Sequence, residues 1–308
     1  MLRSALLAAA KSPACRSLVE NTPPVRPIVD RFVAGDDLDD AVRAAAEIST
    51  DRLVSLDHLG EDTTDREQAG ATVQAYQAVL GALGNRGLAG RAEVSVKLSA
   101  LGQALPVDGE KIALDNARQI CATAASFGTM VTVDMEDHTT TDSTLSIVRD
   151  LRVDFPSTGA VLQAYLRRTE ADCAELSGPG SRIRLCKGAY DEPESVAFRD
   201  KAEVDASYVR CLRTLLGGQG YPMIATHDPR LIEIAEHLAV QAGREHADFE
   251  FQMLYGIRPD AQQRLATRGH RMRVYVPYGA EWYPYFMRRL GERPANIAFF
   301  LRSLLSKG

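Results

Sequence analysis

Arg273-Val-Tyr-Val-Pro-Tyr-Gly279, followed by Tyr285-Phe-Met-Arg-Arg-Leu-Gly-Glu292, has the pattern of a β-strand that leads into an α-helix. The first stretch is rich in β-branched and aromatic residues, and its Pro-Tyr-Gly sequence ends the strand. In the second stretch, Tyr285, Arg288 and Glu292 are spaced so that they share one face of a helix. The last unit of the chain is therefore predicted to be a strand followed by a helix.

The same unit recurs along the chain from about Arg52 onward. Eight short apolar strands alternate with amphipathic helices, and no Gly-rich dinucleotide fingerprint follows a strand. This alternation predicts an α/β fold, a distorted (βα)8 barrel of TIM type, instead of an open doubly wound sheet. The strands are expected at residues 53–56, 93–97, 130–134, 159–163, 182–185, 222–225, 249–252 and 273–276. The helices are expected at residues 65–84, 109–127, 141–153, 168–176, 194–216, 229–241, 259–268 and 282–291.

Residues 1–51 are expected to form a helical extension packed on the barrel, and residues 52–308 the catalytic barrel itself, within one domain overall. The first residues are basic and apolar; a transit peptide would fit this composition, but an amphipathic helix is the favoured interpretation. Thr22-Pro-Pro-Val-Arg-Pro27 predicts an extended connector, because proline does not continue a helix. A second helix should follow, with Asp36 or Asp37 as its N-cap.

The composition is that of an average globular protein, since 45% of the 308 residues are hydrophobic and 25% are charged. The net charge of −5, without a long Lys/Arg run, argues against a nucleic-acid partner. The five cysteines are widely spaced and form no C-x-x-C motif, so neither a zinc knuckle nor a disulfide framework is indicated. No apolar run is long enough to span a bilayer. We therefore expect a cytoplasmic protein, with peripheral contact at the inner face of the membrane at most.

Polar side chains occupy the carboxyl ends of successive predicted strands, where a (βα)8 barrel carries its active site. One such residue alone usually does no more than contact water, but a recurrence at seven strand ends indicates a site. Basic side chains are in excess, so the mouth should attract an anion. No metal site is predicted, because the side chains of a strand alternate between faces, so the set Asp134, Glu136, Asp137 and His138 cannot all converge on one cation. The strand-end residues are Lys97, Asp134, Glu136, Gln163, Arg184, Lys187, Thr226, His227, Gln252 and Tyr275.

Arg288 and Arg289 are adjacent guanidinium groups on the last predicted helix. Taken alone, such a pair is more often solvated than functional. Guanidinium forks nevertheless match a planar carboxylate well. Because adjacent helical residues point about 100° apart, both forks can reach one carboxylate only if the helix lies across the barrel mouth. The pair therefore predicts a displaced final helix as well as a small carboxylate ligand.

Six motifs occur at or near these strand ends. They are Val94-Ser-Val-Lys-Leu-Ser-Ala-Leu101, Arg184-Leu-Cys-Lys-Gly-Ala-Tyr190, Ala225-Thr-His227, Glu250-Phe-Gln-Met-Leu-Tyr-Gly256, Val274-Tyr-Val-Pro-Tyr-Gly279 and Tyr285-Phe-Met-Arg-Arg-Leu-Gly-Glu292. In this order they resemble the motifs of the proline dehydrogenase family, which includes the proline-oxidising domains of bifunctional proline utilisation proteins. The resemblance extends from about residue 30 to the C-terminus, and the length suits the monofunctional bacterial form.

This resemblance implies a noncovalent FAD and the oxidation of L-proline to Δ1-pyrroline-5-carboxylate, the first step of proline catabolism to glutamate. The protein would align proline C5 with flavin N5 so that the cofactor accepts a hydride. It also implies that electrons pass to a membrane quinone and that a separate pyrroline-5-carboxylate dehydrogenase consumes the product.

The resemblance further implies a substrate site. Arg288, Arg289 and Lys97 would bind the proline carboxylate. Asp134 would organise the floor of the site, and Glu292 would orient an arginine. The apolar wall around the pyrrolidine ring would be formed by Tyr190, Leu254, Tyr275 and Tyr285.

The implied cofactor site uses a second set of residues. Arg184 would donate a hydrogen bond near flavin N5, and Gln163 would bind the pyrimidine edge. Further contacts would come from Thr226 and His227 to the adenosine part, from Lys187, Gly188 and Ala189, and more weakly from Lys201 to the pyrophosphate.

Two positions depart from the family pattern. Asp228 stands where Asn is common, and Cys186 stands where an aliphatic residue is common.

Two other functions remain open at this stage. A (βα)8 lyase or aldolase without flavin could form a Schiff base on Lys97 or Lys187. A catalytically silent anion-binding barrel is also compatible with the predicted fold.

Overall fold

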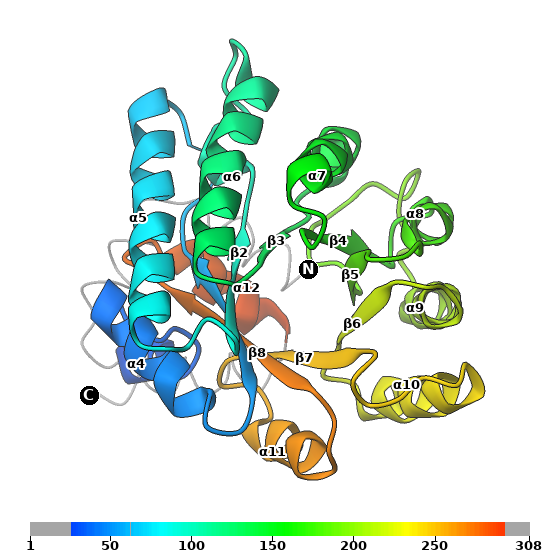
Figure 1. Cartoon of the computed structure of the whole chain (residues 1–308). Coiled ribbons are helices and arrows are strands. Elements are labelled where there is room, and N and C mark those ends of the chain that lie inside the picture. The colour runs from blue at the N-terminus through cyan, green and yellow to red at the C-terminus, as the bar shows by residue number, and fades with distance from the viewer. Residues whose placement is uncertain (1–25, 62, 293–308) are drawn as a thin grey trace, which may run out of the picture.

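The computed structural model describes residues 26–61 and 63–292 and contains a closed barrel of eight parallel strands (Figure 1). The strands follow one another around the barrel in chain order, and β8 pairs with β1 to close it. The predicted barrel is therefore confirmed, and each strand boundary lies within two residues of its predicted position. The strands are β1 (Leu53–His58), β2 (Ala92–Val96), β3 (Val131–Val133), β4 (Gly159–Gln163), β5 (Arg182–Cys186), β6 (Tyr221–Ala225), β7 (Glu250–Leu254) and β8 (Met272–Tyr278).

Helices α5 to α11 form an outer ring around the strands (Figure 1). One predicted boundary was wrong, because α9 was expected from residue 194 but begins at Lys201. Asp200 is its N-cap and accepts from the backbone N–H groups of Ala202 and Glu203, which fixes the helix start. The helices are α5 (Arg66–Asn85), α6 (Gly109–Ser126), α7 (Thr141–Asp154), α8 (Thr169–Leu176), α9 (Lys201–Gly217), α10 (Pro229–Gln241) and α11 (Pro259–Thr267).

Two helices precede the barrel in the described part of the chain, α3 (Arg26–Val29) and α4 (Leu38–Ile48). The first corrects the predicted extended connector at its end, since Pro27 lies in the first turn, where its missing N–H costs nothing. Helix α4 begins as predicted, with Asp37 accepting from the backbone N–H of Asp40. The helix predicted at the N-terminus lies outside the described residues.

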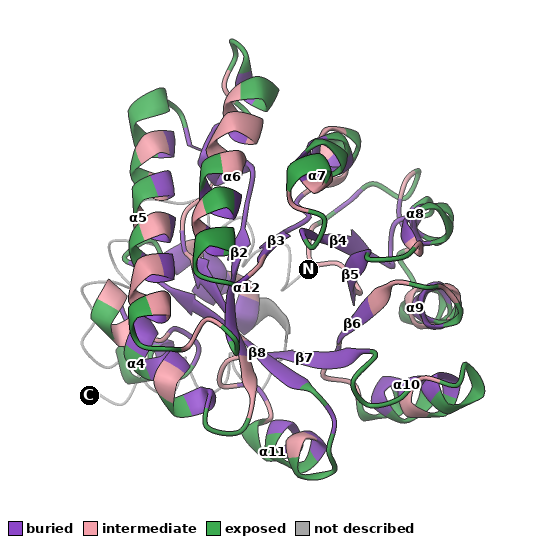
Figure 2. Cartoon of the chain, in the orientation of Figure 1, coloured by how far each residue is buried: buried purple, intermediate pink, exposed green. Residues whose placement is uncertain are grey.

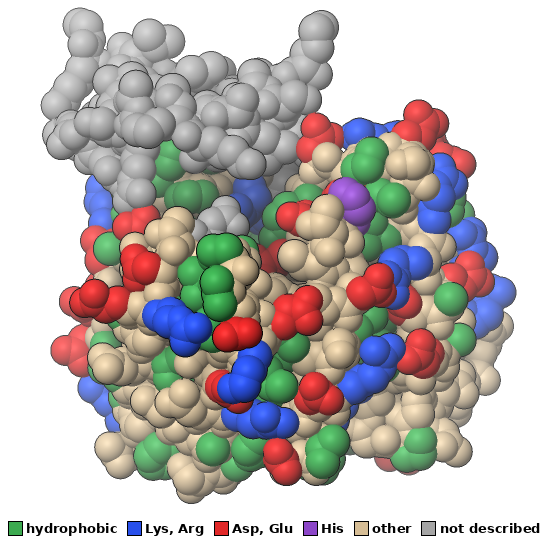
Figure 3. Space-filling model, turned by 90° about the horizontal axis from the view of Figure 1, so that it is seen from above, with side chains coloured by type: hydrophobic (Ala, Val, Ile, Leu, Met, Phe, Trp, Pro, Cys, Tyr) green, Lys and Arg blue, Asp and Glu red, His purple; other side chains and the backbone are tan. Residues whose placement is uncertain are grey.

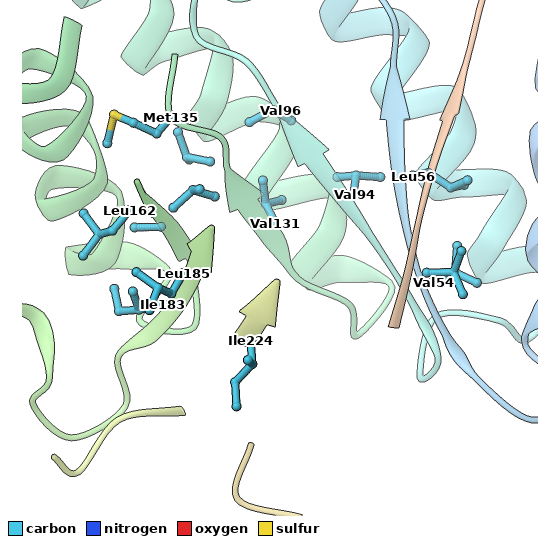
Figure 4. Close-up of a cluster of buried hydrophobic side chains, with 14 of the residues drawn as sticks. Val54, Leu56, Val94, Val96, Val131, Met135, Leu162, Ile183, Leu185 and Ile224 are labelled. Carbon is cyan, nitrogen blue, oxygen red and sulfur yellow. The ribbon is translucent and has the colours of Figure 1, made fainter. Parts of the chain in front are cut away.

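Apolar strand residues pack between the barrel and the helix ring, where they form the main core (Figure 4). Val54, Leu56, Val94 and Val96 are completely buried in this cluster. The helices turn their buried faces toward the strands and their exposed faces outward, as Figure 2 shows. Strand side chains alternate between two faces, so every second residue of each strand must point into the barrel itself.

Many of these inward residues are polar or charged, among them Ser55, Glu93 and Arg184, whereas the lumen of such a barrel is usually filled by branched apolar side chains. Hydrogen bonds between strands that are not neighbours cross the lumen: Arg182 of β5 donates to Glu93 of β2 at 2.7 Å. Within the lumen, Arg273 of β8 also donates to both carboxylate oxygens of Glu250 on the neighbouring strand β7, at 2.6 and 3.1 Å. The barrel is therefore held from inside by ion pairs at its amino end.

The last helix, α12 (Tyr283–Glu292), does not join the outer ring. Figure 1 shows it close to the barrel axis, and its side chains line a cavity together with residues from the carboxyl ends of the strands. The predicted displacement of this helix over the mouth is therefore confirmed. Trp282, Tyr283 and Phe286 pack against Val29 and Phe32, so the segment around α3 supports α12 from outside. Within residues 26–61 and 63–292, none of the helices combines the length and the apolar character needed to cross a bilayer.

Candidate active site

A cavity of roughly 650 Å³ opens at the carboxyl ends of the strands, beneath α12. Its volume is in the usual range for a small-molecule or cofactor site. The side chain of one predicted site residue, Glu292, lies outside the described part of the structure. Of the predicted strand-end residues, Glu136 does not line the cavity. The predicted residues that the cavity brings together are Lys97, Asp134, Gln163, Arg184, Lys187, Gly188, Ala189, Tyr190, Lys201, Thr226, His227, Leu254, Tyr275, Tyr285, Arg288 and Arg289.

Lys97 follows β2 and is paired with a carboxylate on the neighbouring strand. Its Nζ donates to both side-chain oxygens of Asp57, each at 2.8 Å, and both side chains are buried. Burial alone would lower the pKa of this ammonium group, but Asp57 and then Asp134 outweigh it and raise the pKa above its usual value. Lys97 is therefore a fixed positive charge at the floor of the cavity.

Arg184 of β5 lies at the centre of the floor. Its guanidinium donates to Asp134 Oδ1 at 2.6 Å, to Ser95 Oγ at 2.8 Å and to Gln252 Oε1 at 2.5 Å. The ring of Tyr275 lies 5.2 Å from the guanidinium carbon, at the distance of a cation–π contact. Residues from β2, β7 and β8, together with Asp134 directly after β3, thus fix the orientation of this one arginine.

Tyr275 and Asp134 are also bonded to each other. The hydroxyl of Tyr275 donates to Asp134 Oδ2 at 2.6 Å. Burial, and then the negative charge of Asp134, raise the pKa of Tyr275 well above its usual range. Tyr275 therefore stays protonated, and its ring presents an apolar face to the cavity.

The two arginines of α12 have different surroundings. Arg288 donates through both terminal nitrogens to the carboxylate of Glu61, and its Nη1 lies 2.9 Å from Glu61 Oε2. Burial opposes ionisation of Glu61, but Arg288 and Lys97 outweigh it and lower the pKa of this carboxyl. Arg289 lies over the ring of Tyr285, with its guanidinium carbon 5.0 Å from the ring centre. Both forks reach the cavity, as the sequence predicted.

The loop after β5 forms another wall through Lys187, Gly188, Ala189 and Tyr190. Gly188 has a left-handed φ of +113°, and a Cβ at this position would lie 2.3 Å from the ring of Tyr165. Only glycine fits both conditions without strain. The loop is therefore pressed against a neighbouring aromatic residue and held at a fixed distance from it.

Two lysines and two aspartates form ion pairs at the rim of the cavity. Lys187 Nζ lies 2.5 Å from Asp205 and 3.3 Å from Asp228. Lys201 is also paired with Asp205, but its side chain is 76% exposed. Two ammonium groups close together at a rim can bind a phosphate group, in exchange for one of these carboxylates.

The remaining predicted residues bind backbone groups of adjacent loops. Gln163 donates through its amide to the carbonyl of Glu136 at 2.7 Å. His227 accepts at Nε2 from the backbone N–H of Leu254 at 3.0 Å, so its ring ties the loop after β6 to β7. Thr226 Oγ1 accepts from the backbone N–H of Asp228 at 3.1 Å. These contacts fix the loops that surround the cavity.

Sequence reasoning missed Asp57 and Glu61, the two carboxylates that hold Lys97 and Arg288. A signal for Asp57 exists, since it follows Ser55 at the strand spacing of two and belongs to β1, which was predicted to end at Leu56. Glu61 lies in the loop after β1, where no periodic pattern predicts a side-chain direction. Gln252 lines the cavity, as its position at a strand end predicted. Other cavity residues not predicted as site residues are Met135, Val161, Cys186, Ala225, Asp228, Pro229 and Met253.

The cavity carries an excess of positive charge. Its lining contains six lysines and arginines (Lys97, Arg184, Lys187, Lys201, Arg288 and Arg289) against three aspartates (Asp57, Asp134 and Asp228). On the outer face seen in Figure 3, by contrast, acidic and basic side chains are interspersed. A cavity with this lining can draw in a small anion and hold its apolar part against tyrosine rings.

Comparison with known proteins agrees with this chemistry. The family model described as proline dehydrogenase matches residues 41–302. Proline dehydrogenase 1 of Bacillus subtilis (strain 168) is 39% identical over 278 residues, which is 90% of this chain and 90% of the relative. Proline dehydrogenase of Deinococcus radiodurans is also 39% identical, over 99% of this chain and 98% of the relative.

A solved structure supports the same relationship. Proline utilization A from Bdellovibrio bacteriovorus, inactivated by N-propargylglycine, superposes with a TM-score of 0.79 and 26% identity over 86% of this chain. The matched region is 32% of that longer protein, so this chain corresponds to about a third of it. Because the family model and the curated relatives each cover most of its length, the chain belongs to the proline dehydrogenase family of oxidoreductases.

Proposed function

We propose that the protein oxidises L-proline to Δ1-pyrroline-5-carboxylate, by transfer of hydride from proline C5 to N5 of a noncovalently bound FAD. The observation that carries this proposal is the placement of Arg288 and Arg289 beside Tyr275 and Tyr285 in one cavity, with Arg184 on its floor. A carboxylate clamp next to an apolar wall fits a small cyclic amino acid.

In this proposal the carboxylate of proline lies between the guanidinium forks of α12 and the ammonium of Lys97. Glu61 keeps Arg288 extended into the cavity, which reduces the ordering cost when substrate binds. Tyr190, Leu254, Tyr275 and Tyr285 enclose the pyrrolidine ring and exclude water from it. These side chains hold the ring in one orientation, which is the main contribution that the protein makes to a hydride transfer.

The lining is compatible with FAD in its charge and its shape. Arg184 is a buried donor fixed by Asp134, and Gln163 lies on the same floor. Lys187 and Lys201 would hold the pyrophosphate, Gly188 and Ala189 would add contacts from the loop after β5, and Thr226 with His227 would contact the adenosine part. When bound, the flavin supplies the hydride acceptor, and a fixed cationic donor such as Arg184 favours its electron-rich reduced form.

The electrons would then pass to a membrane quinone, which requires the protein to approach the membrane from the cytoplasmic side. The product would be consumed by a separate pyrroline-5-carboxylate dehydrogenase. Both partners are proposed from the family relationship.

The Schiff-base alternative is less well supported. Formation of a Schiff base requires a neutral amine, and the pKa of Lys97 is raised by its carboxylate neighbours after burial is overcome. Lys187 is engaged by two carboxylates at the rim, so no second function is put forward for either lysine.

The purified protein should be yellow, or should take up FAD on titration, and should reduce a quinone analogue in the presence of L-proline. Hydroxyproline is the comparison substrate, because it has the same carboxylate and a bulkier ring. A colourless protein that binds no FAD would contradict the proposal, and trapping of a substrate on Lys97 or Lys187 by borohydride would support the lyase instead. Arg184→Met should alter the flavin spectrum or potential more than it alters proline binding.

A further inference from the structure

A buried carboxylate outside the cavity joins three loops at the barrel mouth. Glu192 lies in the loop after β5, and its side chain is only 4% exposed. It accepts from the backbone N–H of His138, in the loop after β3, at 2.9 Å, and it also contacts the imidazole Nδ1 of that residue. Its Oε1 accepts from the hydroxyl of Tyr165, in the loop after β4, at 3.2 Å.

Tyr165 connects this carboxylate to the cavity wall. Burial and Glu192 raise the pKa of the Tyr165 hydroxyl, and the backbone of Tyr190 acts in the opposite direction. The ring of Tyr165 lies against Gly188, where no Cβ would fit, and its backbone N–H donates to the carbonyl of Lys187 at 2.8 Å. The segment Lys187–Tyr190 is thus held at its backbone by a residue that does not itself line the cavity.

The position of Tyr190 bears directly on the substrate clamp. Tyr190 lines the cavity, and it lies close enough to Arg288 for the two groups to influence each other's pKa. A shift of this loop would therefore change the distance between the apolar wall and the guanidinium pair. The distance between those two features decides how well a ring that bears a carboxylate fits.

Packing alone does not account for a carboxylate at position 192. Burying a charged group is costly unless its oxygens accept several hydrogen bonds, and an apolar residue would fill the same volume at less cost. The donors of Glu192 come from the two preceding loops, so its carboxylate fixes their positions relative to its own loop.

We propose that Glu192 and Tyr165 are positioning residues that hold Tyr190 in the substrate wall and so set the affinity for the ring of the substrate. This inference rests on the proposed function. Neither side chain touches the reacting atoms, and both act through the backbone of the loop after β5.

The first test is Tyr165→Phe, which keeps the ring against Gly188 and removes only the hydroxyl. The KM for proline should rise about three- to tenfold, as for the loss of one hydrogen bond, while kcat changes less than twofold and FAD stays bound. Cyclopentanecarboxylate as a competitive inhibitor should weaken by the same factor and acetate by less than twofold, because acetate uses the clamp but not the wall. Glu192→Gln, which keeps the shape and one acceptor, should change the KM in the same direction.

A double-mutant cycle separates positioning from general support of the fold. In the background of Tyr190→Leu, which removes the side chain that is being positioned, Tyr165→Phe should no longer change the KM. Tyr208→Phe is the matched control, since its buried hydroxyl bonds the carbonyls of Leu185 and Ala225 and its side chain does not line the cavity. It should lower stability without changing the KM.

The outcomes distinguish this inference from the proposed function. A wild-type protein without proline-dependent activity contradicts the proposed function. An active wild type whose KM and inhibitor affinities are unchanged by Tyr165→Phe and by Glu192→Gln overturns the positioning role alone. If Tyr165→Phe does not fold, Glu192→Gln decides the question by the same measurements.

Discussion

The lumen of the barrel contains ion pairs at both ends, but they are arranged for different tasks. At the amino end, Glu93 and Glu250 are paired with Arg182 and Arg273 in a buried network, and none of these four side chains lines the cavity. Glu93 also lies 3.7 Å from Arg184, which connects this network to the floor of the cavity. At the carboxyl end, pairs such as Lys97 with Asp57 line the cavity. The same residue types thus stabilise the barrel at one end and bind a ligand at the other.

The difference lies in which groups can change partners. At the amino end every charge already has a protein partner, and a buried ion pair of this kind adds little net stability although the loss of one partner is costly. At the carboxyl end the cationic groups border open space, so an anionic ligand can replace or join their carboxylate partners. Substitutions at the two ends should therefore affect different measurements.

Glu93→Ala should have the largest effect, and the effect should be on stability. Burial opposes ionisation of Glu93, but Arg182, Arg273 and Arg184 outweigh it and lower its pKa to about 2. Removal of the carboxylate leaves buried guanidinium groups uncompensated, at a cost on the order of 3–5 kcal/mol. Urea denaturation measures this loss, with the exposed Glu47→Ala on α4 as the control. Equal midpoints for the two variants would show that the buried network at the amino end does not stabilise the fold.

Arg288→Ala should have the next largest effect, and the effect should be on substrate binding. Truncation of one partner of a buried charge pair costs on the order of 2–5 kcal/mol, so the KM for proline should rise by at least roughly thirtyfold while FAD stays bound. Without Arg288, burial would favour the protonated form of Glu61, which limits the loss of stability. Steady-state kinetics together with a denaturation curve test the prediction. Unchanged proline kinetics in both Arg288→Ala and Arg289→Lys would rule out the carboxylate clamp.

Glu136 offers a comparison with Glu93, because both carboxyls are buried but they have different partners. Glu136 accepts from the backbone N–H of Ser99 at 3.0 Å and from its hydroxyl at 2.5 Å. Burial raises the pKa of Glu136 to about 7, and the hydrogen bonds from Ser99 only partly oppose the shift. Guanidinium partners, not hydrogen bonds alone, therefore decide whether a buried carboxyl in this barrel is charged.

The raised pKa predicts a pH-dependent loss of stability. Below pH 4.5 the group is protonated in both the folded and the unfolded chain, and as the pH rises toward 7 only the unfolded chain releases the proton. Stability due to this group is thus present at low pH and is lost by about pH 8, by an amount on the order of 3 kcal/mol. Glu136→Gln should remove this dependence, so the difference in unfolding free energy between variant and wild type should grow in favour of the variant from pH 5 to pH 8. A difference that is constant with pH would mean that Glu136 is ionised in the folded protein.

The sequence predicted the barrel because period-two apolar strands and amphipathic helices are local patterns. It failed where long-range contacts decide the structure. Residues 194–200 have a helical composition, yet the antiparallel bridge between Leu166 and Ala197 holds part of this segment against the preceding loop. The partner of Lys97 was not predicted, because it depends on the register that places Asp57 opposite Ser95 between β1 and β2. The strand ends identified where the cavity lies, but the carboxylates that orient its cations come from other elements.

The smallest effect is expected for a substitution at the rim of the cavity, and the quantity affected should be FAD affinity. This prediction tests whether burial matters for charged groups at the carboxyl end as it does at the amino end. Lys201 is 76% exposed and Lys187 is 30% exposed, although both are paired with Asp205. A solvated ion pair contributes less than about 1 kcal/mol and is weakened by salt. Lys201→Ala should therefore reduce FAD affinity less than about fivefold, with a difference that disappears at high ionic strength, whereas Lys187→Ala should weaken FAD binding more and in a less salt-dependent way. Fluorescence titration of FAD at two salt concentrations measures both. Equal losses of FAD affinity for the two variants would mean that the contribution of a lysine at this end of the barrel does not depend on its burial. In that case the pyrophosphate would bind Lys201 as strongly as Lys187.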